Sequence, residues 1–211
     1  MKKRTKLNYI LAAAIVITSL GGIFLIHRVD EKLISAIAIL LSATLALSAA
    51  LLNLAYSRQT AREANSLDFQ KRLQDNKEYI KHVRKVGEAI SKRNELNFTE
   101  LAQPEQRSNE YAIAIRYVLN TWEQASNAIR HDLYDELYLY EAYKSMVIDF
   151  GLYFREFISS SQMRQVTFYE NFSWLVLKWL IRRDSIKEKT RKAELKIIFN
   201  KLNDIDPKKV H

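Results

Sequence analysis

The densest group of side chains that could do chemistry lies at positions 131 to 136. It consists of His131, Asp132, Asp135 and Glu136. If this segment were helical, His131 and Asp135 would lie one turn apart and could hold a divalent metal ion. The same residues also suit a helix junction, because an aspartate can cap a helix and acids favour its first turn. We predict the junction, and we therefore expect no metal and no other cofactor.

Three more charged residues are candidates for a polar site. Glu123 lies beside a regular apolar seam, where it could pair with Arg130 or Arg164. We predict that such a pair is structural rather than catalytic, so no catalytic residue is predicted. The candidate functional polar positions are Glu123, Arg130, Asp135, Glu136 and Arg164.

The residue types exclude several classes of enzyme. The absence of cysteine excludes a disulfide framework, a thiolate zinc site and a cysteine nucleophile. The four glycines stand in no pattern that cradles a phosphate, which argues against kinases and dinucleotide-binding enzymes. His82 and His131 are the only histidines between the apolar N-terminal segments and the last residue. Few histidines are thus present to serve as the base of a catalytic triad. Enzymatic activity is therefore not our prediction.

The same composition points to helices. Four glycines and two prolines among 211 residues are too few for a fold made of many strands and tight turns. About 150 residues follow the apolar start, which is room for one soluble domain with its own core. We predict an all-α fold.

Two uncharged segments near the N-terminus are long enough to cross a membrane. They cover residues 7–26 and 33–56, and at about 1.5 Å per residue each can cross about 30 Å of hydrocarbon. A signal peptide has a shorter apolar region and no second span so soon afterwards. Helices of a soluble core would carry polar residues on at least one face. We predict an N-terminal two-helix transmembrane hairpin at residues 1–56, followed by a cytosolic helical bundle.

Basic residues give the orientation of this hairpin. By the positive-inside rule both termini are cytoplasmic, and the protein is a multi-pass protein of the bacterial inner membrane. Small residues recur every four positions in both spans, so the helices can approach closely within the hairpin or, alternatively, in a homo-oligomer. The basic residues before the first span are Lys2, Lys3, Arg4 and Lys6. Those after the second span are Arg58, Arg62, Lys71 and Arg72. The turn contains only Arg28 and Lys32.

Helical periodicity continues beyond the second span. Residues 57–108 are predicted to form an amphipathic helix and a connection, the latter polar and containing Pro104. The helix is expected to pack against later helices, with a coiled-coil stalk as the alternative. Its seam steps by four and three residues through Phe69, Leu73, Asn76, Ile80, Val83, Gly87 and Ile90.

Residues 109–211 are predicted to form the helical domain. Its first helix has the most regular seam of the chain, from Tyr111 to Ile129, and ends near His131. Asp132 or Asp135 caps a helix to about Ile158, and the serines at 159–161 break it. An aromatic helix follows over about residues 163–183, and we expect it to be the central helix with Trp179 in the core.

A family resemblance appears in this domain. Its residues are Trp122 and Glu123 in one helix, Ala128 to Arg130, then Leu133, Asp135 and Glu136, and finally Phe157, Ile158 and Arg164. The stretch from Asn120 to Arg164 resembles the DUF4760 family of uncharacterised bacterial proteins, over roughly residues 110–180. The resemblance implies one or two membrane spans followed by a helical cytosolic domain, and it implies no activity.

The excess positive charge of the soluble part lies at its C-terminal end. Residues 57–181 carry 17 basic and 17 acidic side chains, whereas residues 182–211 carry 10 and 5. A basic amphipathic helix near a bilayer is attracted to anionic headgroups, with a solvated face as the alternative. The basic run has no interleaved aromatic residues, which argues against nucleic acid. The candidate headgroup contacts are Arg182, Arg183, Lys187, Lys189, Arg191, Lys192 and Lys196.

Two classes of function remain. The first is a membrane-anchored cytosolic interaction module, with the bilayer and a protein partner or a second copy as its partners. Its cellular setting would be a phage-response or superinfection-exclusion system. The second is a membrane-tethered enzyme or metal-dependent nuclease-like protein. We predict the first class.

Overall fold

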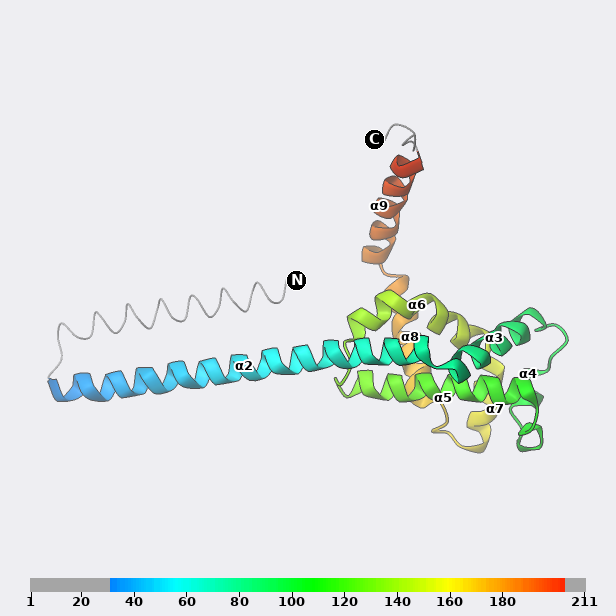
Figure 1. The fold of residues 1–211 in the computed structure, drawn as a ribbon, viewed down its shortest axis with the longest axis horizontal. Coiled ribbons are helices and arrows are strands. Elements are labelled where there is room, and N and C mark those ends of the chain that lie inside the picture. The colour runs from blue at the N-terminus through cyan, green and yellow to red at the C-terminus, as the bar shows by residue number, and fades with distance from the viewer. Residues whose placement is uncertain (1–30, 204–211) are drawn as a thin grey trace. The chain divides into compact units, whose positions relative to one another are not determined.

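The computed structural model describes residues 31–203, and these form helices without any strand (Figure 1). The all-α prediction is therefore confirmed for this part of the chain. The first predicted span, residues 7–26, lies outside the described residues, so the predicted hairpin is not tested by them. The helices are α2 (Glu31–Asp75), α3 (Lys77–Ser91), α4 (Phe98–Leu101), the 3-10 helix η1 (Pro104–Gln106), α5 (Glu110–Arg130), α6 (Glu136–Tyr153), α7 (Arg155–Arg164), α8 (Glu170–Arg183) and α9 (Ile186–Asn203).

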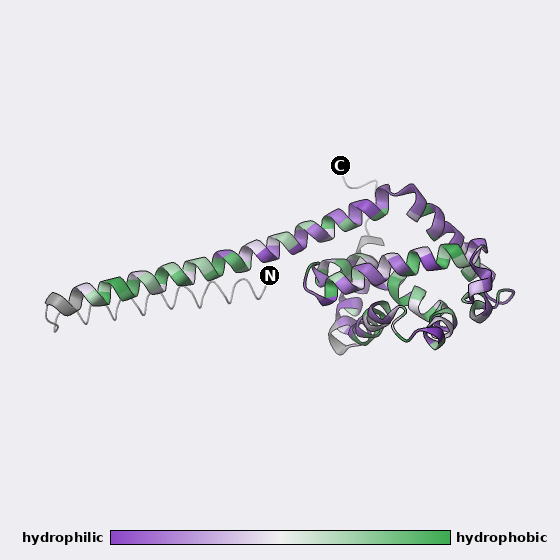
Figure 2. Ribbon diagram, turned by 90° about the horizontal axis from the view of Figure 1, so that it is seen from below, coloured by the Kyte–Doolittle hydropathy of each residue, from purple (hydrophilic) through white to green (hydrophobic). Residues whose placement is uncertain are grey.

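The chain divides into two compact units, with the boundary between Thr60 and Ala61. The first unit contains the apolar part of α2, which Figure 2 shows in the colours of hydrophobic residues. Among the described residues, α2 is the one helix long and apolar enough to cross a membrane. Soluble proteins also contain long apolar helices in their cores, but none of the apolar stretch of α2 is buried.

Two hydroxyl groups of this apolar stretch form hydrogen bonds within the helix. Thr44 donates to the carbonyl of Leu40, and Ser48 donates to the carbonyl of Thr44, both at 2.8 Å. In hydrocarbon an unpaired hydroxyl group costs free energy, and these bonds remove that cost. The polar residues of the stretch are therefore compatible with a lipid environment.

The second unit begins within α2 and contains α3 to α9. The prediction of one amphipathic helix through residues 57–93 is wrong at Asn76, which separates α2 from α3. The side chain of Asn76 accepts hydrogen bonds from the backbone N–H groups of Glu78 and Tyr79, at 3.0 and 3.1 Å. Asparagine favours this N-cap geometry over a helix interior. Asn76 is thus a cap rather than a member of the apolar seam.

Helices α5 and α8 form the centre of the second unit, as the aromatic pattern predicts. Trp122 of α5 and Trp179 of α8 are fully buried, and their rings meet edge to face with centroids 6.5 Å apart. Tyr140 of α6 also meets Trp179 edge to face, at 5.5 Å. Trp122 donates its Nε1–H to the hydroxyl of Tyr79 in α3 at 3.1 Å, and burial raises the pKa of Tyr79 to about 12. These contacts join α3, α5, α6 and α8 in one core.

The boundaries of the later helices differ from the prediction. The helix expected to reach Ile158 ends at Tyr153, and the buried Phe154 separates it from α7. The predicted break at residues 159–161 is wrong, because Ser160 and Ser161 are buried inside α7. Ser161 donates to the carbonyl of Phe157, and Ser160 donates to the carbonyl of Thr99 in α4. These hydrogen bonds satisfy the buried hydroxyl groups and allow the serines to remain inside a helix.

The aromatic helix also begins later than predicted. Residues 165–169 form a turn, and α8 starts at Glu170 rather than near residue 163. Tyr169 has a left-handed backbone conformation with φ of 56° and ends this turn. Its side chain is buried, which compensates for a conformation that a non-glycine residue rarely adopts.

Candidate functional site

Glu123 of α5 caps the N-terminus of α8. Its Oε1 accepts hydrogen bonds from the backbone N–H and the side-chain amide of Asn171, at 3.2 and 2.8 Å. Its Oε2 accepts a hydrogen bond from the backbone N–H of Phe172 at 2.7 Å. The first N–H groups of a helix have no partner within the helix, and a carboxylate there also favours the helix dipole. A cap of this kind contributes about 0.5–2 kcal/mol to stability.

The predicted ion pair of Glu123 with Arg130 or Arg164 is wrong, because both arginines have other partners. Arg130 donates to Glu170 and Asn171 at the start of α8, and its guanidinium lies over the ring of Trp174. Arg164 donates to the carbonyl of Ala102 at 2.7 Å. Spacing along the chain did not show that Glu123 would meet the N-terminus of α8.

Arg116 is a polar residue of this region that sequence reasoning missed. Its guanidinium donates to three successive carbonyls, those of Leu101, Ala102 and Gln103, at 3.0–3.2 Å. Desolvation is the main cause that lowers the pKa of Arg116, and the nearby positive charge of Arg164 lowers it further. Arg116 and Arg164 therefore hold the C-terminal end of α4, where carbonyl groups lack partners within the helix. Their arrangement is that of structural residues.

The acidic stretch at 131–136 forms the predicted helix junction. Asp132 pairs with Arg62 of α2, and Asp135 caps α6 by accepting a hydrogen bond from the N–H of Tyr138 at 3.0 Å. Glu136 pairs with Lys178 of α8 at 2.7 Å. In the part of the chain that the structure describes, no three histidine, cysteine or acidic side chains gather in a way that could hold a metal ion.

Two of the predicted headgroup contacts interact with side chains of the domain. Arg191 of α9 forms a bidentate pair with Glu141 of α6, with N–O distances of 2.5 and 2.8 Å. The guanidinium of Arg182 lies 4.0 Å from the centroid of the Tyr140 ring. Arg183 pairs with its neighbour Asp184 at 3.1 Å. The side chain of Lys187 lies outside the described residues, while Lys189, Lys192 and Lys196 are exposed.

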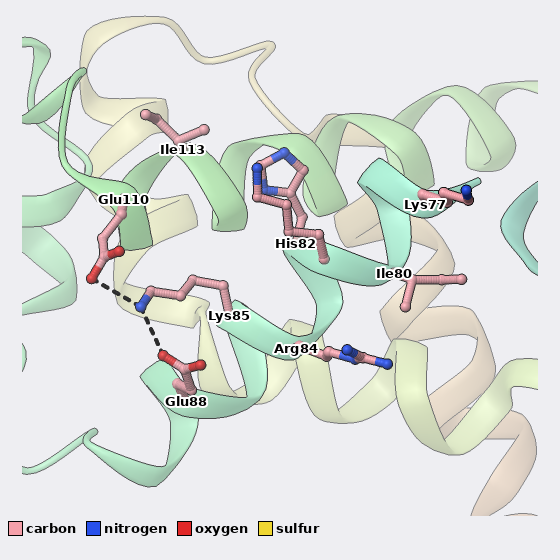
Figure 3. Close-up of a pocket in the computed structure, with 9 residues that line it drawn as sticks. Lys77, Ile80, His82, Arg84, Lys85, Glu88, Glu110 and Ile113 are labelled. Carbon is pink, nitrogen blue, oxygen red and sulfur yellow. Dashed lines mark hydrogen bonds and ion pairs between the residues drawn. The ribbon is translucent and has the colours of Figure 1, made fainter.

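The second unit carries an open groove of about 790 Å³ formed by α3 and the first turns of α5 (Figure 3). We call it the α3–α5 groove. Ile80 of α3 and Ile113 of α5 supply its apolar part, and four cations face two carboxylates around them. The lining residues are Lys77, Ile80, Lys81, His82, Arg84, Lys85, Glu88, Glu110 and Ile113.

The charges of the groove differ in how they are paired. Figure 3 shows Lys85 between the two carboxylates, 2.7 Å from Glu88 and 2.9 Å from Glu110, and these hydrogen bonds raise the pKa of Lys85. Within the described residues, Lys77 and Arg84 have no hydrogen-bond or ion-pair partner. The groove therefore has one end where the charges compensate each other and one end with unpaired positive charge.

The remaining lining residues support this division. Lys81 forms an exposed ion pair with Glu78 at 3.8 Å, and such a pair contributes little to the free energy of folding. The ring of His82 stacks on Tyr117 of α5, with centroids 4.4 Å apart. Lys77, Lys81 and Arg84 are spaced by four and three residues and so share one face of α3. This spacing was the available sequence signal, but only the packing of α3 beside α5 makes the face part of a groove.

In the part of the chain that the structure describes, the fold and this surface define an all-helical class of protein, with one candidate membrane-spanning helix, a compact helical unit and a basic surface groove. The family model for "Domain of unknown function (DUF4760)" matches residues 37–179, and the chain belongs to this family. The match is longer than the predicted stretch of 110–180, since it begins in the apolar part of α2, and it leaves out α9. Searches of curated proteins and of solved structures found no match.

Proposed function

We propose that this protein is a membrane-anchored interaction module whose α3–α5 groove binds an acidic segment of a cytosolic protein partner. One observation carries this proposal: the unpaired cations Lys77 and Arg84 line the same groove of about 790 Å³ as the apolar side chains of Ile80 and Ile113, and Ile113 is exposed. By contrast, Glu123, Arg130, Asp135, Glu136 and Arg164, the polar residues predicted to be functional, all contribute to the structure of the domain.

The chemistry of the groove selects the class of partner. Its two isoleucines suit apolar side chains, while Lys77, Lys81 and Arg84 favour carboxylates at the same spacing on a bound helix. Nucleic-acid grooves instead present aromatic side chains for base stacking, and His82 and Tyr117 stack on each other here. A protein segment with acidic and apolar residues therefore fits better than a nucleic acid.

The anchor we propose is the two-helix hairpin with spans at residues 7–26 and 33–56. The uncharged stretches in the sequence support both spans, and the unburied apolar surface of α2 supports the second. The distribution of basic residues supports cytoplasmic termini in a bacterial inner membrane.

The cellular setting that we propose, phage response or superinfection exclusion, rests on analogy with other small membrane-anchored helical proteins. It is tested by plaque counts on a deletion strain and on a strain that overproduces the protein. Nothing in the described residues favours the alternative of a membrane-tethered enzyme.

Site-specific photo-crosslinking tests the binding function. A photoreactive amino acid replaces Ile113 in the full-length protein in living cells, and the crosslinked product is identified by mass spectrometry. We expect a product with an acidic peptide of one protein, and we expect Lys77→Glu with Arg84→Glu to abolish it. Lys71→Glu with Arg107→Glu is the matched control, because both residues are exposed cations outside the groove.

Three results would contradict the proposal. The first is a product that survives reversal of both groove charges, and the second is a product that the control abolishes equally. The third is a product with lipid or nucleic acid in place of protein. Circular dichroism of each variant shows that the helices are retained, so that loss of the product reports on the groove.

A further inference from the structure

A pocket of about 250 Å³ lies where the end of α2 and the start of α3 face the middle of α5. Phe69, Leu73 and Ala125 supply its apolar part. Arg72 is the one charged side chain among the described residues that line it. The pocket shares no lining residue with the α3–α5 groove, so it is a separate site.

Three tyrosines line this pocket, and the hydroxyl group of each accepts a hydrogen bond. Tyr117 accepts one from Nδ2 of Asn76 and Tyr134 accepts one from Arg72, both at 3.4 Å. Asn76 and Arg72 also line the pocket, so these two hydroxyl groups lie at its wall. The hydroxyl group of Tyr79 accepts from an indole N–H at 3.1 Å.

Each of these hydroxyl groups still has its own hydrogen to donate, because a phenol is both a donor and an acceptor. Within the described residues, no acceptor meets the hydrogen of Tyr79, Tyr117 or Tyr134. Burial raises the pKa of Tyr79 to about 12, so this residue keeps its proton at neutral pH. The pocket therefore presents several O–H donors and needs a ligand that supplies acceptors.

The tyrosine rings are held in place by the fold. The ring of Tyr117 stacks on His82 with centroids 4.4 Å apart, and the ring of Tyr134 packs on Phe69 at 5.4 Å. The side chain of Tyr79 is 7% exposed. Because these contacts fix the donors before a ligand arrives, binding loses little conformational entropy.

We propose that this site, the tyrosine pocket, binds a small aromatic carboxylate. A carboxylate only accepts hydrogen bonds, and its two oxygens can take several of them from hydroxyl groups and from the guanidinium of Arg72. The apolar and aromatic walls suit a flat ring. The volume is sufficient for one or two fused rings, since an apolar cavity of about 150 Å³ holds benzene.

The charge of the pocket selects a carboxylate over a phosphate. A phosphate group carries about two negative charges, whereas Arg72 is a single cation. Arg72 pairs with Asp68 at 3.1 Å, but both side chains are more than 60% exposed, and such a pair contributes little free energy. Arg72 can therefore exchange this partner for a ligand. The inference does not depend on the function proposed for the α3–α5 groove.

Calorimetric titration of the full-length protein in lipid nanodiscs tests this inference. The probes are benzoate, nicotinate and quinoline-2-carboxylate, with empty nanodiscs as the blank and the corresponding amides as uncharged controls. We expect at least one carboxylate to bind saturably at one site per chain. Its amide should bind at least about tenfold more weakly, because hydrogen bonds to a charged group are the stronger ones.

Two double variants locate the binding site. Tyr117→Phe with Tyr134→Phe keeps both rings and removes two donors, so it should weaken binding at least about tenfold. Tyr111→Phe with Tyr153→Phe is the matched control, because these tyrosines lie outside the pocket. Circular dichroism verifies that both variants keep their helices. The inference is overturned if no carboxylate binds at millimolar concentration, if the amide binds as tightly, or if both double variants bind equally well.

Discussion

At the scale of single residues, the two described glycines lead to opposite predictions. A Cβ atom on Gly151 would lie 2.5 Å from Cγ1 of Val176, because α6 and α8 approach closely there. Gly151→Ala should therefore destabilise the protein by about 1–3 kcal/mol, the usual cost of overpacking. Chemical denaturation of the full chain in detergent, followed by tryptophan fluorescence, measures this difference in the free energy of unfolding.

Gly87 provides the matched control for that substitution. It lies in α3 with no atom within 4 Å of the position of an added Cβ. Gly87→Ala should stabilise the protein by about 0.5–1 kcal/mol, because alanine loses less conformational entropy in a helix. Val176→Ala should partly rescue Gly151→Ala. A harmless Gly151→Ala, or equal effects at both glycines, would show that the close approach of α6 and α8 is wrong.

At the scale of whole elements, we expect the bidentate pair of Arg191 with Glu141 to help attach α9 to the domain. Hydrogen bonds from Arg191 and then Lys144 lower the pKa of Glu141 from 4.5 to about 2. A carboxyl group whose pKa is lowered by folding stabilises the native state above its unfolded pKa. This contribution is complete above about pH 4.5 and is lost as the pH falls towards 2. We expect the protection of the α9 amides from hydrogen exchange, relative to the intrinsic exchange rate at each pH, to decrease across this window.

Single substitutions separate this attachment from the surface charge of α9. Arg191→Gln should increase hydrogen exchange in α9 at neutral pH. It should also remove the change in the protection of α9 that we expect below pH 4.5. Lys189→Gln and Lys192→Gln should do neither, because the bidentate pair with Glu141 is made by Arg191. If exchange in α9 is the same in all three variants, the pair does not hold the helix.

At the scale of the whole molecule, the proposed hairpin makes a topological prediction. A reporter fused after His211 should be active only in its cytosolic form, and one inserted between Arg28 and Asp30 only in its exported form. Both results follow from an excess of basic residues at the ends of the hairpin over its turn. The opposite pattern would end the argument for this orientation.

One further position distinguishes a hairpin from a single span. With the hairpin, a cysteine in place of Thr5 is cytoplasmic and reacts with a membrane-impermeant maleimide only after the cells are opened. If α2 alone crossed the membrane, the same cysteine would be labelled in intact cells. A cysteine in place of Ser108 serves as the cytoplasmic control.

Local physical chemistry was enough to predict several features of this protein. Scarce glycine and proline predicted helices, and the aromatic pattern predicted that Trp179 lies in the core against α5. The residues of the 131–136 stretch predicted a helix junction, where Asp135 is the cap. These features depend on the composition of short segments and on helical periodicity, both of which can be read from neighbouring positions.

The tertiary structure alone decided how distant segments meet. Glu123 could not be recognised as the cap of α8, because the N–H groups that donate hydrogen bonds to it belong to residues far along the chain. The serines of α7 looked like a helix break because the sequence does not show that Ser160 meets the carbonyl of Thr99 in α4. The α3–α5 groove and the tyrosine pocket arise only when helices lie side by side, since a concave surface is a property of packing rather than of one helix.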